Sequence, residues 1–317
     1  MSPLGINLGV LAQPLGVDPS WFISIWNTSN TSAGSSASNQ VKLPLTSAGT
    51  YNFDVDWGDG NTDTITSWNQ AEVTHTYAVA GTYTIICKPN APGHLRGFRF
   101  AQSGDRLKFL DVIQFGGLQL VNNQGQTFFG CAYFTGASIT DVLDTVGVTS
   151  MSRMFQGCNS YNAAVNFDTS SVTTMFNMFR VANTFNQPIN FNTSSVITMA
   201  QMFQQASNFN QPLNFNTSSV ISISNMFVSA TNFNQNISTW DINQVTSFEN
   251  LMVGVTLSTA NYDALLISWA NQLPFSPSAR TINFGNSKYT STNQTVVDAR
   301  DALIAHFTTA FVDGGPA

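Results

Sequence analysis

The sequence predicts a mainly β protein, in which a β-sandwich is followed by a solenoid of short repeats and by a C-terminal helical cap. Three observations predict it: apolar and polar residues alternate between turn signals over residues 20–90, a 24-residue unit recurs over residues 148–244, and residues 258–317 contain two helical patterns. We divide the chain into an N-terminal assembly or anchor segment, the sandwich, the solenoid and the cap, at residues 1–19, 20–90, 91–257 and 258–317.

The N-terminal segment, residues 1–19, is apolar and contains no Lys or Arg. It is also broken by Pro and Gly, so it lacks the basic start and the unbroken apolar core of a signal peptide. Leu4, Ile6, Leu8 and Val10 alternate with other residues, which would give an extended strand one apolar face. We therefore expect this segment to be buried in another protein by strand addition, as part of an assembly.

Residues 20–90 contain short alternating segments that end in turns. The run TYNFDVDWGDG alternates and then turns at Gly-Asp-Gly, a second strand is expected over residues 62–66, and HTYAVAGTYTIIC contains another turn before a strand at residues 82–87. Short strands with turn signals at this spacing are typical of a β-sandwich.

Three motifs in this part carry a resemblance to a known family. They are Trp-Gly-Asp-Gly at residues 57–60, His-Thr-Tyr at residues 75–77 and Gly-Thr-Tyr-Thr at residues 81–84. With them, about residues 21–89 resemble a polycystic-kidney-disease-type (PKD) domain. The resemblance implies an immunoglobulin-like sandwich that acts as a spacer or binding module, mostly outside cells. We expect His75 to be a packing residue of this motif, since the sequence signals no nucleophile near it.

Four carboxylates crowd into the same part of the sequence: Asp54, Asp56, Asp59 and Asp63. Calcium takes several carboxylate and carbonyl oxygens, so these residues are a candidate calcium site. The alternative is that Asp54 and Asp56 share one face of a strand and that Asp59 organises the turn after it. The sequence indicates no other cofactor.

The repeat region contains apolar columns that recur in every copy. The copy from Val172 reads VTTMFNMFRVANTFNQPINFNTSS, and the next reads VITMAQMFQQASNFNQPLNFNTSS. Because each copy has the same apolar residues at the same positions, they must stack inside a solenoid whose coils bury their cores against one another. We expect a short strand, a single helical turn and a bend in each coil.

A column of Asn follows directly on a core aromatic residue, at Asn162, Asn186, Asn210 and Asn234. These amides could form a glycan-binding row, or an internal ladder that satisfies backbone groups. We expect the internal ladder. We also expect the substitution Asn210→Asp to destabilise it at least as much as Asn210→Ala does.

Cys131 and Cys158 occupy equivalent places in neighbouring copies, so a disulfide between them is conceivable. Ala182 and Ala206 fill the same column, however, which favours small buried thiols. We expect Cys87 to be buried at the end of a strand.

The repeats resemble the short leucine-rich-type repeats of BspA-like surface proteins. The matching residues are Met178-Phe179, Phe185-Asn186-Gln187, Ile189 and Asn192-Thr193-Ser194, with their equivalents 24 residues later. The resemblance covers residues 148–240 and extends with less similarity over residues 107–147. It implies a leucine-rich-repeat-type solenoid used for adhesion or surface display, and it carries no catalytic residues.

Charge is scarce, at 9% of the residues with a net charge of −6. Arg180 is the only charged residue between Val172 and Trp240, which argues against a nucleic-acid partner and against acid–base catalysis on the repeats. A glycosidase needs two facing carboxylates, whereas Asp144, Asp168 and Asp241 lie at separate coil ends. We therefore expect no enzymatic activity, and no apolar run is long enough to span a membrane.

Two segments near the C-terminus, residues 261–272 and 295–307, have amphipathic helical patterns. A stack of repeats needs its last coil covered, so we expect both helices to act as a cap.

Together these features predict a non-enzymatic structural or adhesion protein of a virion, as a bacteriophage decoration, fibre or tail-tip subunit. The alternative is a secreted or cell-surface bacterial adhesin. The expected partners are other virion or surface proteins, bound through residues 1–19, and a host-surface protein or glycan. Homo-oligomers are also conceivable.

Overall fold

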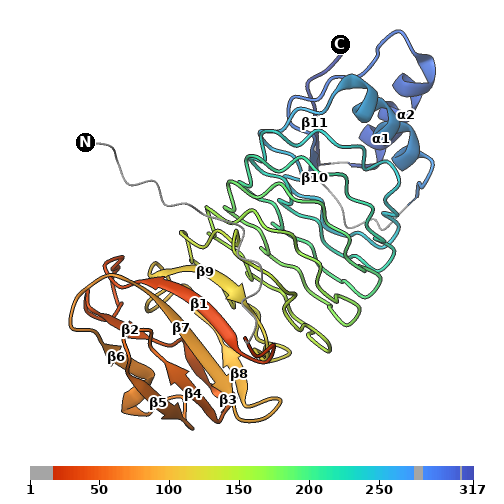
Figure 1. The fold of residues 1–317 in the computed structure, drawn as a ribbon. Coiled ribbons are helices and arrows are strands. Elements are labelled where there is room, and N and C mark those ends of the chain that lie inside the picture. The colour runs from red at the N-terminus through yellow and green to blue at the C-terminus, as the bar shows by residue number, and fades with distance from the viewer. Residues whose placement is uncertain (1–16, 275–280, 308) are drawn as a thin grey trace, which may run out of the picture.

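The computed structural model describes residues 17–274, 281–307 and 309–317. All but the last three residues of the N-terminal segment therefore lie outside the described residues. The described chain forms three parts in a row: a group of β-strands, a stack of repeats and a pair of helices (Figure 1).

The first part is built around a five-stranded antiparallel sheet with strand order β5-β4-β7-β1-β9. The strands β2 and β6 form one further pair, and β3 and β8 form another. The side chains alternate as the sequence predicts, since Phe53 and Val55 are fully buried while Asp54 between them is exposed. The elements are β1 (Phe22–Asn27), β2 (Gln40–Lys42), β3 (Leu45–Tyr51), β4 (Phe53–Asp56), β5 (Thr62–Ile65), the short 3₁₀ helix η1 (Ala71–Val73), β6 (Thr74–Thr76), β7 (Thr82–Pro89), β8 (Leu95–Phe98) and β9 (Phe109–Gln114).

Strand β9 joins the sheet to the repeats. One of its edges pairs with β1, and on the other side Leu110 and Ile113 accept backbone hydrogen bonds from Thr135 and Thr140, at 3.0 and 2.9 Å. The first part therefore extends to residue 114, beyond the expected boundary at residue 90. The sheet ends directly against the first repeat, without a linker between them.

The repeats are held together by backbone hydrogen bonds between coils. The N–H groups of alternate residues donate to carbonyl groups of the next coil at 2.9–3.1 Å, from Met175, Asn177, Phe179 and Val181 to Thr198, Ala200, Met202 and Gln204. Within the coil, Met178 and Ala182 donate to the residues three positions earlier, which makes the coil a run of β-turns. This pattern recurs along the stack, so almost every turn is tied to its neighbour.

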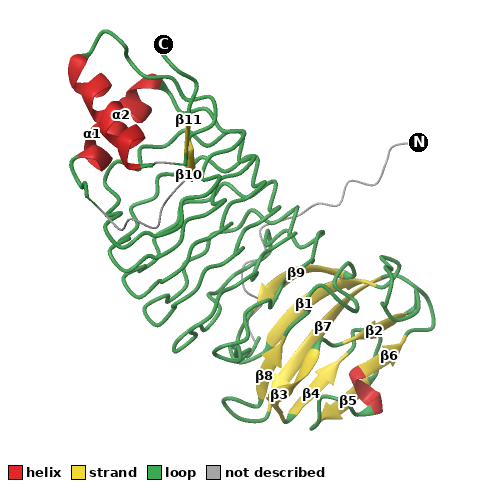
Figure 2. Cartoon of the chain, turned by 180° about the vertical axis from the view of Figure 1, so that it is seen from behind, coloured by secondary structure: helices red, strands yellow, loops and turns green. Residues whose placement is uncertain are grey.

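The predicted fold class is wrong in two respects. The first part has one five-stranded sheet and separate strand pairs, so it matches an immunoglobulin-like β-sandwich only partly. Over residues 115–258, all of which are described, there is no helix and no strand longer than a single β-bridge, so the leucine-rich-repeat-type solenoid is not found (Figure 2). The single helical turn expected in each coil, for which the spacing of Met175 and Met178 is suited, is instead a β-turn whose third residue, Asn177, has a φ of 59°.

The interior of the stack contains columns of parallel aromatic rings. Phe179 stacks on Phe155 and on Phe203, with interplanar angles of 3° in both pairs and centroids 5.5 and 5.7 Å apart. The column continues into the sheet, because Phe128 stacks between Phe155 and Phe109 of β9. The sheet, the repeats and the helices share one hydrophobic core.

The C-terminal part contains the two helices that the sequence predicts, α1 (Thr259–Ala270) and α2 (Gln294–His306), and a parallel strand pair, β10 (Thr281–Asn283) with β11 (Ala310–Val312). Ser258 caps α1 by accepting a hydrogen bond from the backbone N–H of Asn261. The side-chain amide of Asn261 donates to the backbone carbonyl of Asn234 at 2.9 Å, and the side-chain amide of Gln272 donates to the backbone carbonyl of Trp240 at 2.9 Å. The helix α1 is thereby fastened to the last complete repeat.

Candidate binding surface

One face of the stack, which we call the bridge face, contains parallel β-bridges at the same position of each coil. The bridges join one residue per coil, at Ser150, Thr174, Thr198, Ser222 and Ser247. The residue before each bridge position belongs to a second column, which consists of Thr149, Thr173, Ile197, Ile221 and Thr246. The bridge face is therefore two columns wide, with hydroxyl groups along its length and two isoleucines near its middle.

Ile197 and Ile221 lie on neighbouring coils and are unusually exposed for isoleucine, at 47% and 46%. Their backbones are fixed, because Ile197 donates to the carbonyl of Thr173 and Ile221 donates to that of Ile197, both at 2.8 Å. An exposed pair of branched apolar side chains on a rigid backbone loses little conformational entropy when a partner covers it. This pair is the apolar centre of the bridge face.

An aromatic side chain lies on the flank of the same face. Phe176 is half-buried, two residues after the bridge at Thr174, and the guanidinium of Arg153 lies 5.3 Å from its ring centroid. The cation–π contact orients the ring against the preceding coil.

The Asn column forms a ladder along another flank. Oδ1 of Asn162, Asn186 and Asn210 accepts the backbone N–H of the Asn one coil later, at 2.9 Å in each case, and Asn234 accepts that of Ser258 at 2.7 Å. The structural ladder is confirmed, but its side chains are exposed or half-buried, so the expectation that it is internal is wrong. These bonds use the amide oxygen, which an aspartate would also supply.

A second ladder lies inside the stack, and sequence reasoning missed it. Thr145, Thr169, Thr193 and Thr217 are buried, and each donates its hydroxyl to a carbonyl of the next coil at 2.8–3.0 Å. The recurring Asn-Thr-Ser triplet is the signal that could have revealed it. The residue before each Thr is Asp or Asn, and Asp168 accepts the backbone N–H of Ser170, which lowers the pKa of that carboxyl.

Asp144 and Asp241 occupy the same turn position as Asp168 in other coils. Asp144 accepts the backbone N–H of Val146 at 3.1 Å, and Asp241 accepts that of Asn243 at 3.0 Å. The structure therefore places the three carboxylates in turns of different coils, each bonded within its own turn.

The four candidate calcium ligands face separate partners. Asp54 accepts from the Thr64 hydroxyl at 2.7 Å, and Asp63 accepts from the Trp57 indole at 2.8 Å. Asp56 lies 3.5 Å from the Lys88 ammonium, and Asp59 lies 2.8 Å from His75 Nε2. Among the described residues, no three acidic, His or Cys side chains gather closely enough to hold a metal ion.

His75 is a packing residue, as expected. Its ring stacks on Trp57 with centroids 4.8 Å apart and an interplanar angle of 9°, and it meets Tyr77 edge-on. Burial acts to raise the pKa of Asp59, but hydrogen bonds from His75 and Asn61 outweigh it and the pKa is lowered. Burial raises the pKa of Tyr77, whose hydroxyl donates to the Trp57 carbonyl at 3.0 Å.

The three cysteines are free and fully buried, so no disulfide joins Cys131 to Cys158. The Cys158 thiol donates to the Phe128 carbonyl at 3.0 Å, and burial raises the pKa of all three thiols. They act as small apolar residues of the core, as expected.

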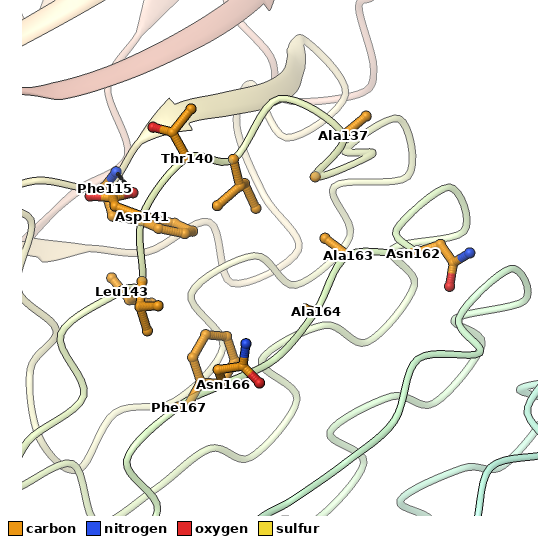
Figure 3. A pocket seen from close by; sticks show the side chains of 13 residues that line it. Phe115, Ala137, Thr140, Asp141, Leu143, Asn162, Ala163, Ala164, Asn166 and Phe167 are labelled. Atoms are coloured by element: carbon orange, nitrogen blue, oxygen red, sulfur yellow. Dashed lines mark hydrogen bonds between the residues drawn. The ribbon is translucent and has the colours of Figure 1, made fainter. Parts of the chain in front are cut away.

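A cavity of about 450 Å³, also missed at the sequence level, lies where the first part meets the repeats. Figure 3 shows it between the segment of Thr140 and Asp141 and the next coil, which contributes Asn162, Ala163 and Asn166.

No helix in the described part of the chain is long and apolar enough to cross a membrane.

A comparison with protein families finds a match in the repeats. Residues 122–214 and 190–269 match the model of a family described as Mycoplasma protein of unknown function, DUF285. No curated protein and no solved structure matches the chain significantly. The repeat region is therefore similar to this family, which loosely agrees with the resemblance to BspA-like repeats, and the match does not reach the first part of the chain.

Proposed function

We propose that the protein is a non-enzymatic structural or adhesion protein whose bridge face binds a surface ligand. The bridge face carries the proposal: it is rigid, lacks charge in its two columns, and exposes Ile197 and Ile221 between rows of hydroxyl groups. Such a surface suits a neutral partner, a glycan or an uncharged protein patch, because apolar contact and hydroxyl hydrogen bonds need no counter-charge.

The first part would act as a spacer or second binding module. The motifs that resemble a PKD-type domain contribute to one aromatic cluster, in which Trp57 stacks on His75, His75 meets Tyr77 edge-on, and Tyr77 stacks on Tyr83. Because β9 hydrogen-bonds to the first repeat, this part would hold the bridge face at a fixed orientation to whatever carries the protein.

The leading location is a virion, as a bacteriophage decoration, fibre or tail-tip subunit, attached through residues 1–19. Composition supports it, since charged residues are only 9% of the chain. The alternative is a secreted or cell-surface bacterial adhesin, and the match to a family described from Mycoplasma favours that alternative.

Immunogold electron microscopy separates these locations. An antibody against the folded protein would be applied to purified virus particles from the source culture and to intact cells of the same culture. Label on particles supports the virion assignment, and label on cells alone supports the adhesin. Label on neither surface would overturn the proposal of surface display.

A further inference from the structure

The cavity beside the first repeat exists because two features of the repeat change at this point. Phe134 and Leu143 are nine positions apart, whereas Tyr161 and Phe167, the equivalent residues of the next coil, are six apart, so the earlier coil has three extra residues. In addition, Ala163-Ala164 stands where the next two copies have Gln-Pro. The cavity of about 450 Å³ lies between the longer coil and the next coil, where the two alanines fill less space than Gln and Pro would.

Most of the residues that line this cavity are apolar or glycine. Of the thirteen residues that line it, four are polar (Thr140, Asp141, Asn162 and Asn166) and nine are apolar or glycine. Asp141 is the one charged residue of the lining, and its carboxylate already accepts hydrogen bonds from the backbone N–H groups of Phe115 and Gly116, at 2.7 and 2.8 Å. Val142, on the same segment, leaves 55% of its surface exposed. The cavity therefore favours an uncharged occupant that offers both apolar side chains and polar backbone groups.

Backbone donors on one wall are also free. Among the described residues, the N–H groups of Ala163, Ala164 and Asn166 have no hydrogen-bond partner. An extended segment lying along this wall would find both apolar contacts and unpaired donors, which is the combination that strand addition uses.

The N-terminal segment enters the described structure beside this cavity. The Asp18 carbonyl accepts a hydrogen bond from the Gln114 side chain at 2.9 Å. Phe115, which follows Gln114 in the chain, lines the cavity. The sixteen residues before Val17 carry no charged side chain and alternate apolar residues over positions 4–10. Extended, they reach roughly 50 Å, far more than is needed to return to the adjoining wall. The short connection also gives the chain's own segment a high effective concentration there.

We propose that residues 4–10 of the same chain dock in this cavity, along the wall formed by residues 163–166. The docked segment places its alternating apolar side chains against the cavity lining and accepts hydrogen bonds from the free N–H groups. Docking within the chain competes with attachment to another protein through residues 1–19, so it would replace that part of the proposed function and leave the proposal for the bridge face unchanged.

Hydrogen–deuterium exchange of the full-length protein tests it. Amides of residues 163–166 should exchange about tenfold or more slowly in the full chain than in a truncated chain that begins at Val17. The amides of residues 187, 189 and 190, at equivalent positions of the next coil, serve as the internal control and should be unaffected, whereas Pro188 has no amide hydrogen. Equal exchange at residues 163–166 in the two chains would overturn the proposal.

Substitutions within the segment avoid any effect on the fold. The double substitution Ile6→Asp and Leu8→Asp should remove the protection, whereas Ser2→Asp with Gln13→Asp, which adds the same charge, should retain it. The protection should also be independent of protein concentration. Protection that increases with concentration would show that a second copy supplies the segment, and would overturn docking within one chain.

Discussion

Phe179 and Phe203 lie almost parallel inside the stack, with ring planes 3° apart and centroids 5.7 Å apart. Both rings are fully buried, and Phe203 also stacks on Phe227 of the following coil at 5.8 Å. Each ring is thus covered on both sides by equivalent rings, so the stability of one coil depends on its two neighbours.

The variant Phe203→Ala should be strongly destabilised, because it removes a ring that contacts both neighbouring coils. Truncation of a buried Phe costs about 3–5 kcal/mol. Urea unfolding followed by tryptophan fluorescence would measure the loss. Phe176→Ala is the matched control, and its loss should be much smaller because Phe176 is only half-buried. Equal losses of stability in the two variants would mean that a ring stacked inside the core contributes no more stability than a half-buried ring does.

Val181 has a φ of 60°, in the left-handed region that β-branched residues rarely adopt. The equivalent residue one coil earlier is Gly157, with a φ of 70°. Val181→Gly should therefore leave the stability unchanged or raise it by up to about 1 kcal/mol, since relief of backbone strain offsets the entropy of glycine. Gly157→Val should lower it. The melting temperatures of the two variants would check this, and a large loss for Val181→Gly would contradict it.

Asn210→Ala should destabilise the stack by about 0.5–1.5 kcal/mol, because the backbone N–H of Asn234 and the amide of Gln235 lose a shared acceptor. Asn210→Asp keeps that oxygen and should be tolerated better, the reverse of the sequence-based expectation. Chemical denaturation of both variants gives the comparison. A larger loss for Asp than for Ala would restore the original expectation.

The C-terminal part should lose stability in acid through Asp313. Burial acts to raise the pKa of this carboxyl, but bonds from Arg300, Gly315 and Tyr262 outweigh it, so the pKa lies below its ordinary value of 3.8. A lowered pKa in the folded state stabilises the protein above that ordinary value, and the contribution disappears as the pH falls through the folded-state pKa. In Asp313→Asn, the stability should be lower at pH 7 and its decrease below about pH 4 should be smaller. Thermal unfolding between pH 2 and pH 7 measures both, and parallel curves for the two proteins would contradict the assignment.

The inward columns of the repeats could be predicted from the sequence, and their backbone could not. Val172, Met175, Phe179 and Phe185 recur with a fixed period, and all four are fully buried. The conformation between them depends on left-handed residues such as Val181, and valine does not favour that region. A period shows which side chains share an environment, but both helical turns and β-turns can satisfy the same spacing.

The candidate surface was only partly predictable for a related reason. The Asn column was identified from its regular recurrence, whereas Ile197 and Ile221 look like core residues in a sequence and are exposed. The cavity arises from three inserted residues and from Ala163-Ala164, which are departures from the repeat. The position of the cavity depends on which coils lie side by side, and the structure was needed to show this.

The central claim, that the bridge face is the binding surface, is tested most directly by ligand binding with two matched double variants. Ile197→Asp with Ile221→Asp places charges at the apolar centre of the face, and Asn190→Asp with Asn214→Asp adds the same charge at exposed positions away from the face, in the copies that begin at residues 172 and 196. Binding to a glycan array and to surface material from the source culture would be measured for both variants and for the native protein. We expect the isoleucine variant to bind at least about tenfold more weakly, and the asparagine variant to bind as the native protein does. Equal binding by the two variants, or no specific binding by the native protein, would contradict the claim.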